Sequence, residues 1–225
     1  MLKNLTSSRS FCILGGLSGI VGVILILVSF TINSGPPPGA TSAELIKFGR
    51  QYYASVLWGA WLQAVGPVLI ILFAFSLVHL AGATQRLSGW MTFFGATILM
   101  TVSLIEITFY ISALHSDPPV MPFISLALIS AVQHLYFIVA APALFLPLGI
   151  VLLSSSVLPR LFGYLALLLG ILFAILGVTF LLRLSLPAGV TAFAGVQAVW
   201  WLAAGITLIV QSRKLAGTDS NPLSG

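Results

Sequence analysis

Residues 161–182 read LFGYLALLLGILFAILGVTFLL, a run of 22 residues without one charged side chain. A transmembrane helix needs roughly 20 consecutive, mostly apolar residues, so this single stretch is long enough to cross a bilayer. A membrane β-barrel would instead show short segments of alternating hydrophobicity. The stretch therefore predicts a membrane-spanning α-helix.

The rest of the chain has the same character. Its 225 residues are 59% hydrophobic and only 6% charged, whereas about a quarter of a soluble domain is charged. We therefore predict an all-α integral membrane protein with six transmembrane helices in a single domain, residues 1–211, followed by a disordered cytoplasmic tail, residues 212–225. The six predicted spans are Phe11–Ile32, Tyr53–Leu80, Ser88–Ala113, Phe123–Leu153, Leu161–Leu182 and Pro187–Val210.

The net charge of +5 is spread over single basic residues near the helix ends, so nothing indicates a nucleic-acid partner. In the six-span arrangement, one side of the membrane receives Lys3, Arg9, Arg86, Arg160, Arg213 and Lys214. The other side receives Lys47, Arg50 and Arg183. Lys and Arg favour the cytoplasmic side, so we expect both termini to be cytoplasmic.

The segment before the second span carries a helix start signal. Thr41 and Glu44 have the spacing of a capping box, in which each side chain bonds to the other residue's backbone. From Thr41 to Leu80 is about 39 residues, or ~58 Å of helix, against a bilayer core of ~30 Å. Either the first part of this helix lies at the membrane interface or projects outward, or a break interrupts the helix. The segment that begins at Thr41 could serve as an interfacial anchor or as a cap over an outward-facing pocket.

A weak internal repeat links two pairs of helices. RLSGW at 86–90 opens the third span, and RLFGY at 160–164 opens the fifth. Gly66-Pro67 and Ala141-Pro142 occupy matching places in the spans before them. The second and third helices and the fourth and fifth helices are therefore predicted to be two tandem parallel hairpins, an arrangement that occurs in some transporters.

Two stretches carry a resemblance to known proteins. The Pro-rich first loop is followed by SAE at residues 42–44, and the fifth span begins with LPRLFGYLALLLGIL at residues 158–172. With these features the chain resembles a domain-of-unknown-function family of six-helix bacterial inner-membrane proteins. The resemblance implies the six-helix fold and a location in the bacterial inner membrane. It supplies no catalytic residues.

Polar side chains inside membrane spans are costly and are functional candidates. Glu106, within SLIEITFY at 103–110, lies about eight residues, or ~12 Å, below the outer end of its helix. Gln63 and Gln197 lie ~14 Å deep, and His134 at most ~18 Å. Because these residues come from four helices yet share the outer half of the membrane, we predict an outward-facing polar pocket between the second, third, fourth and sixth helices.

Within this pocket, Glu106 and His134 are the predicted ionisable pair, and Tyr110 shares the helix face of Glu106. Arg183, at the outer end of the fifth helix, is a rival ion-pair partner because its long side chain can reach into the span. The structural alternative is that Glu106 closes a hydrogen-bond network between helices. The sequence leaves both readings open.

Signatures of metal and redox chemistry are absent from the sequence. It contains no H-E-x-x-H or C-x-x-C, and we predict no metal site, no cofactor and no catalytic residues. Three classes of function stay open. The first is binding or transport of a small or lipid-like molecule, and such transport could be coupled to protons. The second is a structural or accessory subunit that contacts a membrane-protein partner or a second copy of itself. The third, less favoured, is a membrane enzyme acting on a lipid or quinone.

Overall fold

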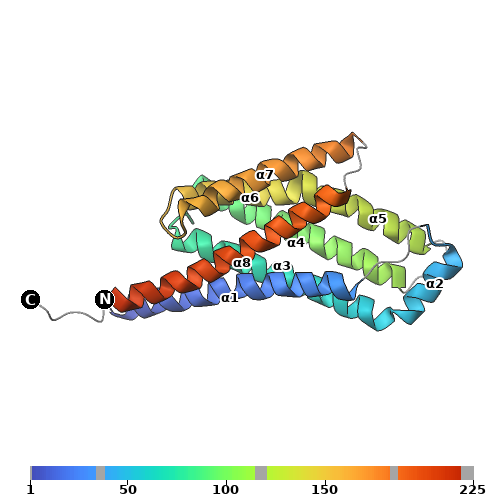
Figure 1. Ribbon diagram of the computed structural model, residues 1–225, viewed down its shortest axis with the longest axis horizontal. Coiled ribbons are helices and arrows are strands. Elements are labelled where there is room, and N and C mark those ends of the chain that lie inside the picture. Colours follow the sequence, from blue (N-terminus) through green and yellow to red (C-terminus); the bar gives the residue numbers. More distant parts are fainter. Residues whose placement is uncertain (1, 34–38, 115–120, 183–186, 219–225) are drawn as a thin grey trace, which may run out of the picture.

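The computed structural model describes residues 2–33, 39–114, 121–182 and 187–218. The described chain is helical throughout, apart from short turns (Figure 1). The elements are α1 (Leu2–Ile32), α2 (Ser42–Gln51), α3 (Tyr53–Leu80), α4 (Leu87–Leu114), α5 (Met121–Leu135), the π-helical turn η1 (Tyr136–Ala140), α6 (Ala141–Leu153), α7 (Arg160–Leu181) and α8 (Pro187–Thr218).

Within the described residues, six helical segments are long and apolar enough to cross a membrane, which confirms the predicted all-α, six-span fold. The fourth span is built from α5, η1 and α6 in succession. One boundary differs from the prediction. Helix α8 continues to Thr218, so residues 212–218 of the predicted disordered tail are helical. No proline interrupts the chain there, and the Ser212 hydroxyl donates to the Ile209 carbonyl within the helix.

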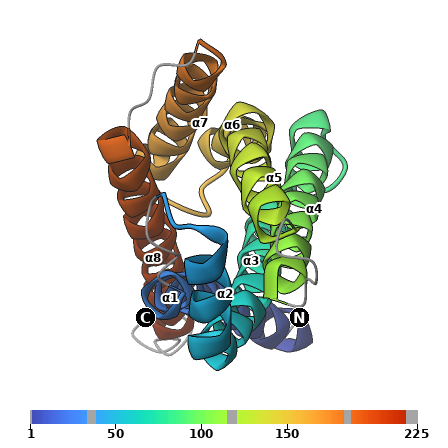
Figure 2. The ribbon, with the colours of Figure 1, turned by 90° about the vertical axis from the view of Figure 1, so that its right-hand side faces the viewer.

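The spans form a ring when viewed from the end that carries α2 (Figure 2). Helix α1 packs between α3 and α8, and α6 packs between α4 and α7, while α3 contacts α4 and α7 contacts α8. The start of α1 and the end of α8 lie at the same end of the molecule, opposite α2 (Figure 1). An even number of crossings requires this arrangement.

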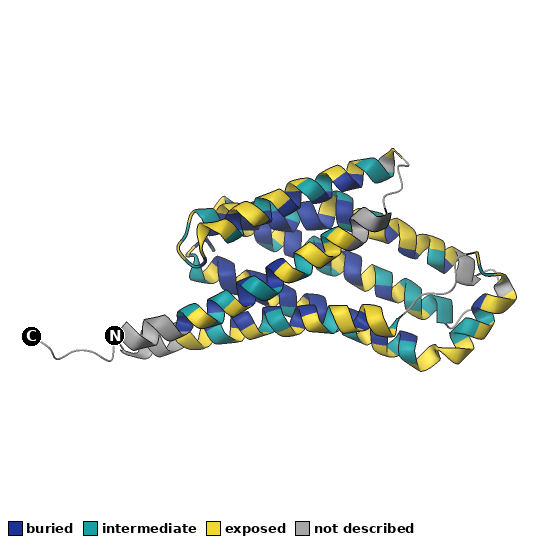
Figure 3. Cartoon of the chain, viewed as in Figure 1, coloured by how far each residue is buried: buried dark blue, intermediate teal, exposed yellow. Residues whose placement is uncertain are grey.

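The outward faces of the ring are apolar. On α7, the exposed side chains Leu161, Leu168 and Ile175 recur every seven residues, which is two helical turns. Exposed and buried positions alternate around each helix in this way (Figure 3). An exposed apolar stripe on every span has lipid as its natural solvent.

The predicted capping box is present at the start of α2. The Thr41 backbone N–H donates to the Glu44 carboxylate at 2.7 Å, and the Glu44 N–H donates to the Thr41 hydroxyl at 3.4 Å. The long helix predicted from Thr41 to Leu80 is broken at Tyr52, whose backbone (φ −108°, ψ 17°) leaves the helical region. Helix α2 contacts α4 and α5 as well as α3, and it buries Leu45.

The π-helical turn η1 lies immediately before Pro142. Proline has no N–H and its ring clashes with the carbonyl four residues earlier, so it disfavours regular α-helix in the turn before it. Here the Ala141 N–H bonds to the Tyr136 carbonyl, five residues back. The extra residue rotates everything after it by about one position, so a helical wheel drawn across the whole span misplaces one half.

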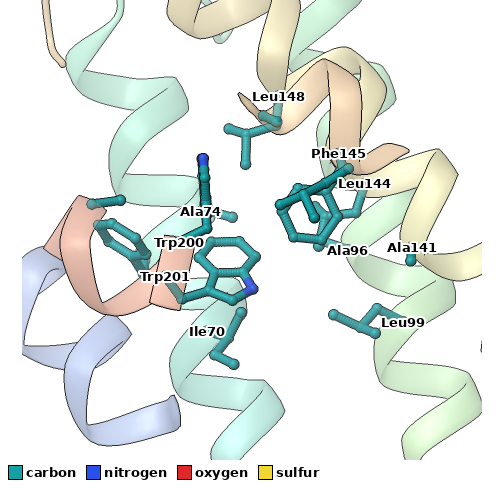
Figure 4. Close-up of a cluster of buried hydrophobic side chains, with 14 of the residues drawn as sticks. Ile70, Ala74, Ala96, Leu99, Ala141, Leu144, Phe145, Leu148, Trp200 and Trp201 are labelled. Carbon is teal, nitrogen blue, oxygen red and sulfur yellow. The ribbon is translucent and has the colours of Figure 1, made fainter. Parts of the chain in front are cut away.

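An aromatic layer fills the ring toward the chain termini. This aromatic floor consists of Phe73, Phe145, Phe173, Trp200 and Trp201, from α3, α6, α7 and α8, all of them buried. The Phe145 ring lies 5.5 Å from Trp200 and 5.3 Å from Trp201 (Figure 4). The Trp200 indole N–H also donates to the Phe162 carbonyl of α7 at 3.1 Å, which ties α8 to α7.

Both predicted hairpins form, one from α3 and α4 and the other from the α5–α6 span and α7. They differ at their prolines, because α3 stays α-helical through Pro67 while the π turn precedes Pro142. Their relation as tandem repeats remains a prediction.

Candidate polar site inside the helix ring

The Glu106 carboxylate on α4 is held by two glutamine amides from different helices. Gln63 of α3 donates from Nε2 to Oε2 at 2.8 Å, and Gln133 of α5 donates from Nε2 to Oε1 at 2.8 Å. We call Gln63, Glu106 and Gln133 the polar cluster. Gln63 and Glu106, which were expected at a similar depth, are in direct contact, and the cluster joins three spans through one carboxylate.

All three side chains point away from lipid. On α4, the exposed stripe includes Thr101 and Thr108, and Glu106 is five residues after the first and two before the second. At 3.6 residues per turn, Glu106 is roughly 150° from that stripe. Gln63 has a similar offset from the exposed Trp58 and Trp61 of α3. The carboxylate therefore faces the interior of the ring.

Gln133 has the same offset on α5, five residues after the exposed Leu128 and two before the exposed Leu135. Its side chain is nevertheless exposed, and so is Ser130 one turn earlier. Gln63, by contrast, is 7% exposed. The exposed arc of α5 therefore extends from its lipid-facing side through Ser130 to Gln133, which leaves one amide of the polar cluster accessible.

The polar cluster lies nearer to α2 than the aromatic floor does. On α8, Trp201 of the aromatic floor is one turn further toward the chain terminus than Gln197. On α4, the buried Leu99 lies seven residues, about 10 Å, on the floor side of Glu106. The polar cluster therefore occupies the α2 half of the ring, with the buried aromatic floor beneath it.

Gln197 is linked to this half of the ring through a tyrosine. The Tyr136 hydroxyl in η1 donates to Gln197 Oε1 at 2.6 Å, so the π turn is bonded to α8. Tyr110, one turn after Glu106 on α4, is half-buried. Tyr110 therefore shares the helix face of Glu106, while Gln197 bonds to Tyr136 in the turn that follows α5.

His134 does not join them. Its Nδ1 bonds to the Ser130 carbonyl of its own helix, and its ring packs edge-on against Phe180 of α7 at 4.7 Å. Consecutive helix residues point about 100° apart, so when Gln133 faces α4 its neighbour must face elsewhere. The predicted Glu106–His134 pair is replaced by the Glu106–Gln133 pair. Gln133 was recognisable in the sequence as an intramembrane amide, but depth alone does not distinguish it from His134.

Among the described side chains, no positive charge pairs with the Glu106 carboxylate. Its hydrogen-bond partners are neutral amides. The predicted rival partner, Arg183, lies outside the described residues. In the part of the chain that the structure describes, no three His, Cys, Asp or Glu side chains gather in a group able to hold a metal ion.

Comparison of the chain with profiles of known protein families, with curated protein sequences and with solved structures found no match. The chemistry of the site must therefore be argued from its geometry. A carboxylate offers about four lone-pair positions, of which the two amides use two. Glu106 can accept further hydrogen bonds, or a cation or proton, from the open side of the cluster.

Proposed function

We propose that this chain is a binding or transport-type protein of the bacterial inner membrane, with cytoplasmic termini, that takes up a small or lipid-like molecule at Glu106. Its opening would then face away from the cytoplasm. The observation that carries the proposal is the exposure of Gln133 on the interior side of its helix, in direct contact with the carboxylate.

A carboxylate that served packing alone would gain most from a sealed, fully bonded environment. An ionised group in a low-dielectric interior is costly unless it is paired and fully hydrogen-bonded. Here one oxygen meets the buried amide of Gln63 and the other meets an accessible amide. The accessible side is the natural point for a ligand to replace the Gln133 contact.

Proton coupling forms part of the proposal. Neutral amides stabilise a carboxylate by hydrogen bonding but leave its charge in place. A proton on Glu106 would remove that charge whenever the site is empty, and intramembrane carboxyl groups are recurrent elements of proton relays. Uptake of the molecule and release of the proton would then alternate at the same two oxygens.

Native mass spectrometry of purified protein tests the proposal. Wild type and two variants, Glu106→Gln and Thr108→Val, are purified identically and their retained small molecules are compared. Gln at 106 preserves hydrogen bonding but removes the carboxylate, so we expect at least a tenfold loss of retained molecule, equivalent to about 1.4 kcal/mol. Thr108 faces outward and its hydroxyl donates to the Leu104 carbonyl of its own helix, so its variant should behave as wild type. Equal retention in all three proteins would contradict a role for Glu106 in binding.

A structural role is the second candidate, and one observation favours it. Both carboxylate oxygens have protein partners, so the polar cluster fastens α3, α4 and α5 together. An accessory subunit of a membrane complex could use it only to hold these helices. In that case Glu106→Gln would lower thermal stability while wild type and variant both purify without any retained molecule.

A further inference from the structure

We infer that the molecule bound at Glu106 is an organic cation, an ammonium-type charge on an apolar body. This inference rests on the proposed function and names the substrate class of the same site. Three features carry it: the uncompensated carboxylate, the phenol rings beside it, and the accessible side of the polar cluster.

The first feature is charge. Among the described side chains Glu106 has hydrogen bonds from neutral amides and no ion pair, although it faces the interior of an apolar bundle. The described basic residues nearest to this end in the chain, Lys47 and Arg50, are exposed on α2. A bound cation would supply the missing opposite charge, and a neutral or anionic molecule would not.

The second feature is aromatic. Tyr110 lies one turn after Glu106 on α4, and Tyr136, three residues after Gln133, packs edge-on against Phe137 at 5.2 Å. Aromatic faces attract cations, with roughly 0.5–2 kcal/mol per contact, the upper value applying when water is excluded. A carboxylate beside phenol rings favours a large, weakly hydrated organic cation.

A metal ion fits the same residues less well. Divalent cations require several oxygen, nitrogen or sulfur ligands at fixed distances. Glu106 is one carboxylate, and among the described residues no second or third acidic, His or Cys side chain joins it. An organic cation needs only one counter-charge, together with apolar and aromatic surface for its body.

The third feature is access. Gln133 and Ser130 are exposed on the interior side of α5, and rotation of the Gln133 side chain would free Oε1 of Glu106. The buried aromatic floor lies beneath this level, so we expect a bulky molecule entering from the α2 end to stop here. Its apolar body would rest among Tyr110, Tyr136 and Phe137.

Two rigid probes of the same size and opposite charge test the inference. Tetraphenylphosphonium is a cation and tetraphenylborate an anion, and binding of each to detergent-purified protein is measured by equilibrium dialysis. We expect wild type and Thr108→Val to bind the cation at least tenfold more tightly than the anion. In Glu106→Gln, the preference should fall to about that of empty detergent micelles.

A second variant guards against a Glu106→Gln protein that fails to fold. Gln133→Lys places a resident ammonium group beside Glu106, so it should form an ion pair, keep the fold and exclude tetraphenylphosphonium. A wild type without cation preference, a preference that survives in Glu106→Gln, or undiminished cation binding in Gln133→Lys would each overturn the inference.

These outcomes are separable from the proposed function. If Glu106→Gln loses the co-purified molecule but wild type shows no preference between the probes, Glu106 is a binding residue for a molecule that is not a cation. If retention of the co-purified molecule is unchanged in Glu106→Gln, the proposed function fails whatever the probes do.

Discussion

The two amides that hold Glu106 should contribute unequally to stability, although their hydrogen bonds have the same length of 2.8 Å. The perturbations are Gln63→Leu and Gln133→Leu, each of which removes one amide and keeps similar side-chain volume. Gln63 is 7% exposed, whereas Gln133 is exposed. The two oxygens therefore lose their partners in different surroundings.

Removing Gln63 leaves Oε2 of Glu106 buried without a donor. The cost of an unsatisfied buried polar group is about 1–3 kcal/mol, and more when the group is charged. Removing Gln133 leaves Oε1 at an accessible position, where water can replace the amide. The stability lost in this variant should be close to the average contribution of an intramembrane hydrogen bond, about 0.6 kcal/mol. We therefore expect Gln63→Leu to be the more damaging variant by about 1–2 kcal/mol.

The measurement is reversible unfolding in mixed micelles, with Thr108→Val as a control expected to stay within about 0.5 kcal/mol of wild type. Each leucine variant is then combined with Glu106→Gln in a double-mutant cycle, which isolates the coupling of each amide to the carboxylate. Equal costs for the two variants, or a larger cost for Gln133→Leu, would refute the reasoning, because the accessible oxygen would then depend on its amide as strongly as the buried one.

Two further predictions concern other parts of the molecule. Gly95→Ala should destabilise the protein by about 1–3 kcal/mol, since its methyl group would overlap the Ala143 backbone carbonyl of α6, while Gly195→Ala, with open space around it, should be neutral in the same unfolding assay. Bonding from the Thr41 backbone N–H, and then from its hydroxyl, lowers the pKa of Glu44 in the folded protein. The capping contribution is therefore complete above the ordinary carboxylate pKa and is lost as the pH falls through the lowered value. Protection of α2 amides in hydrogen exchange, corrected for intrinsic rates, should fall over that range in wild type and stay constant in Glu44→Gln.

The fold was predictable from sequence because its determinants are local. Apolar runs of the required length locate the spans, and the Thr41–Glu44 spacing locates the start of α2. The mismatch between helix length and bilayer thickness required an interfacial or projecting segment or a break, but did not say where a break would fall. The sequence around Tyr52 carries no signal of a helix break, because aromatic residues are common within helices. Pro142 predicts an irregularity in its helix, but it does not predict that this irregularity is a π turn.

The depth of the site residues in the membrane was predictable from sequence, but the direction in which each side chain points was not. Counting residues from helix ends correctly grouped Glu106 with Gln63, because depth along a helix follows from rise per residue. Which way a side chain points depends on how each helix is rotated in the ring, and that is set by contacts between distant segments. His134 and Gln133 have nearly equal depths, yet one packs against Phe180 and the other reaches the carboxylate.

The aromatic floor has an electrical consequence. Glu106 lies eight residues from the end of α4 at Leu114, or about 12 Å, against a hydrocarbon core of ~30 Å. An elementary charge that crosses the entire membrane exchanges about 2.3 kcal/mol per 100 mV with the transmembrane potential. A charge that enters from the α2 end and stops above the floor crosses less than half of that field, which corresponds to roughly 1 kcal/mol per 100 mV. Occupancy of the site would then respond to membrane voltage.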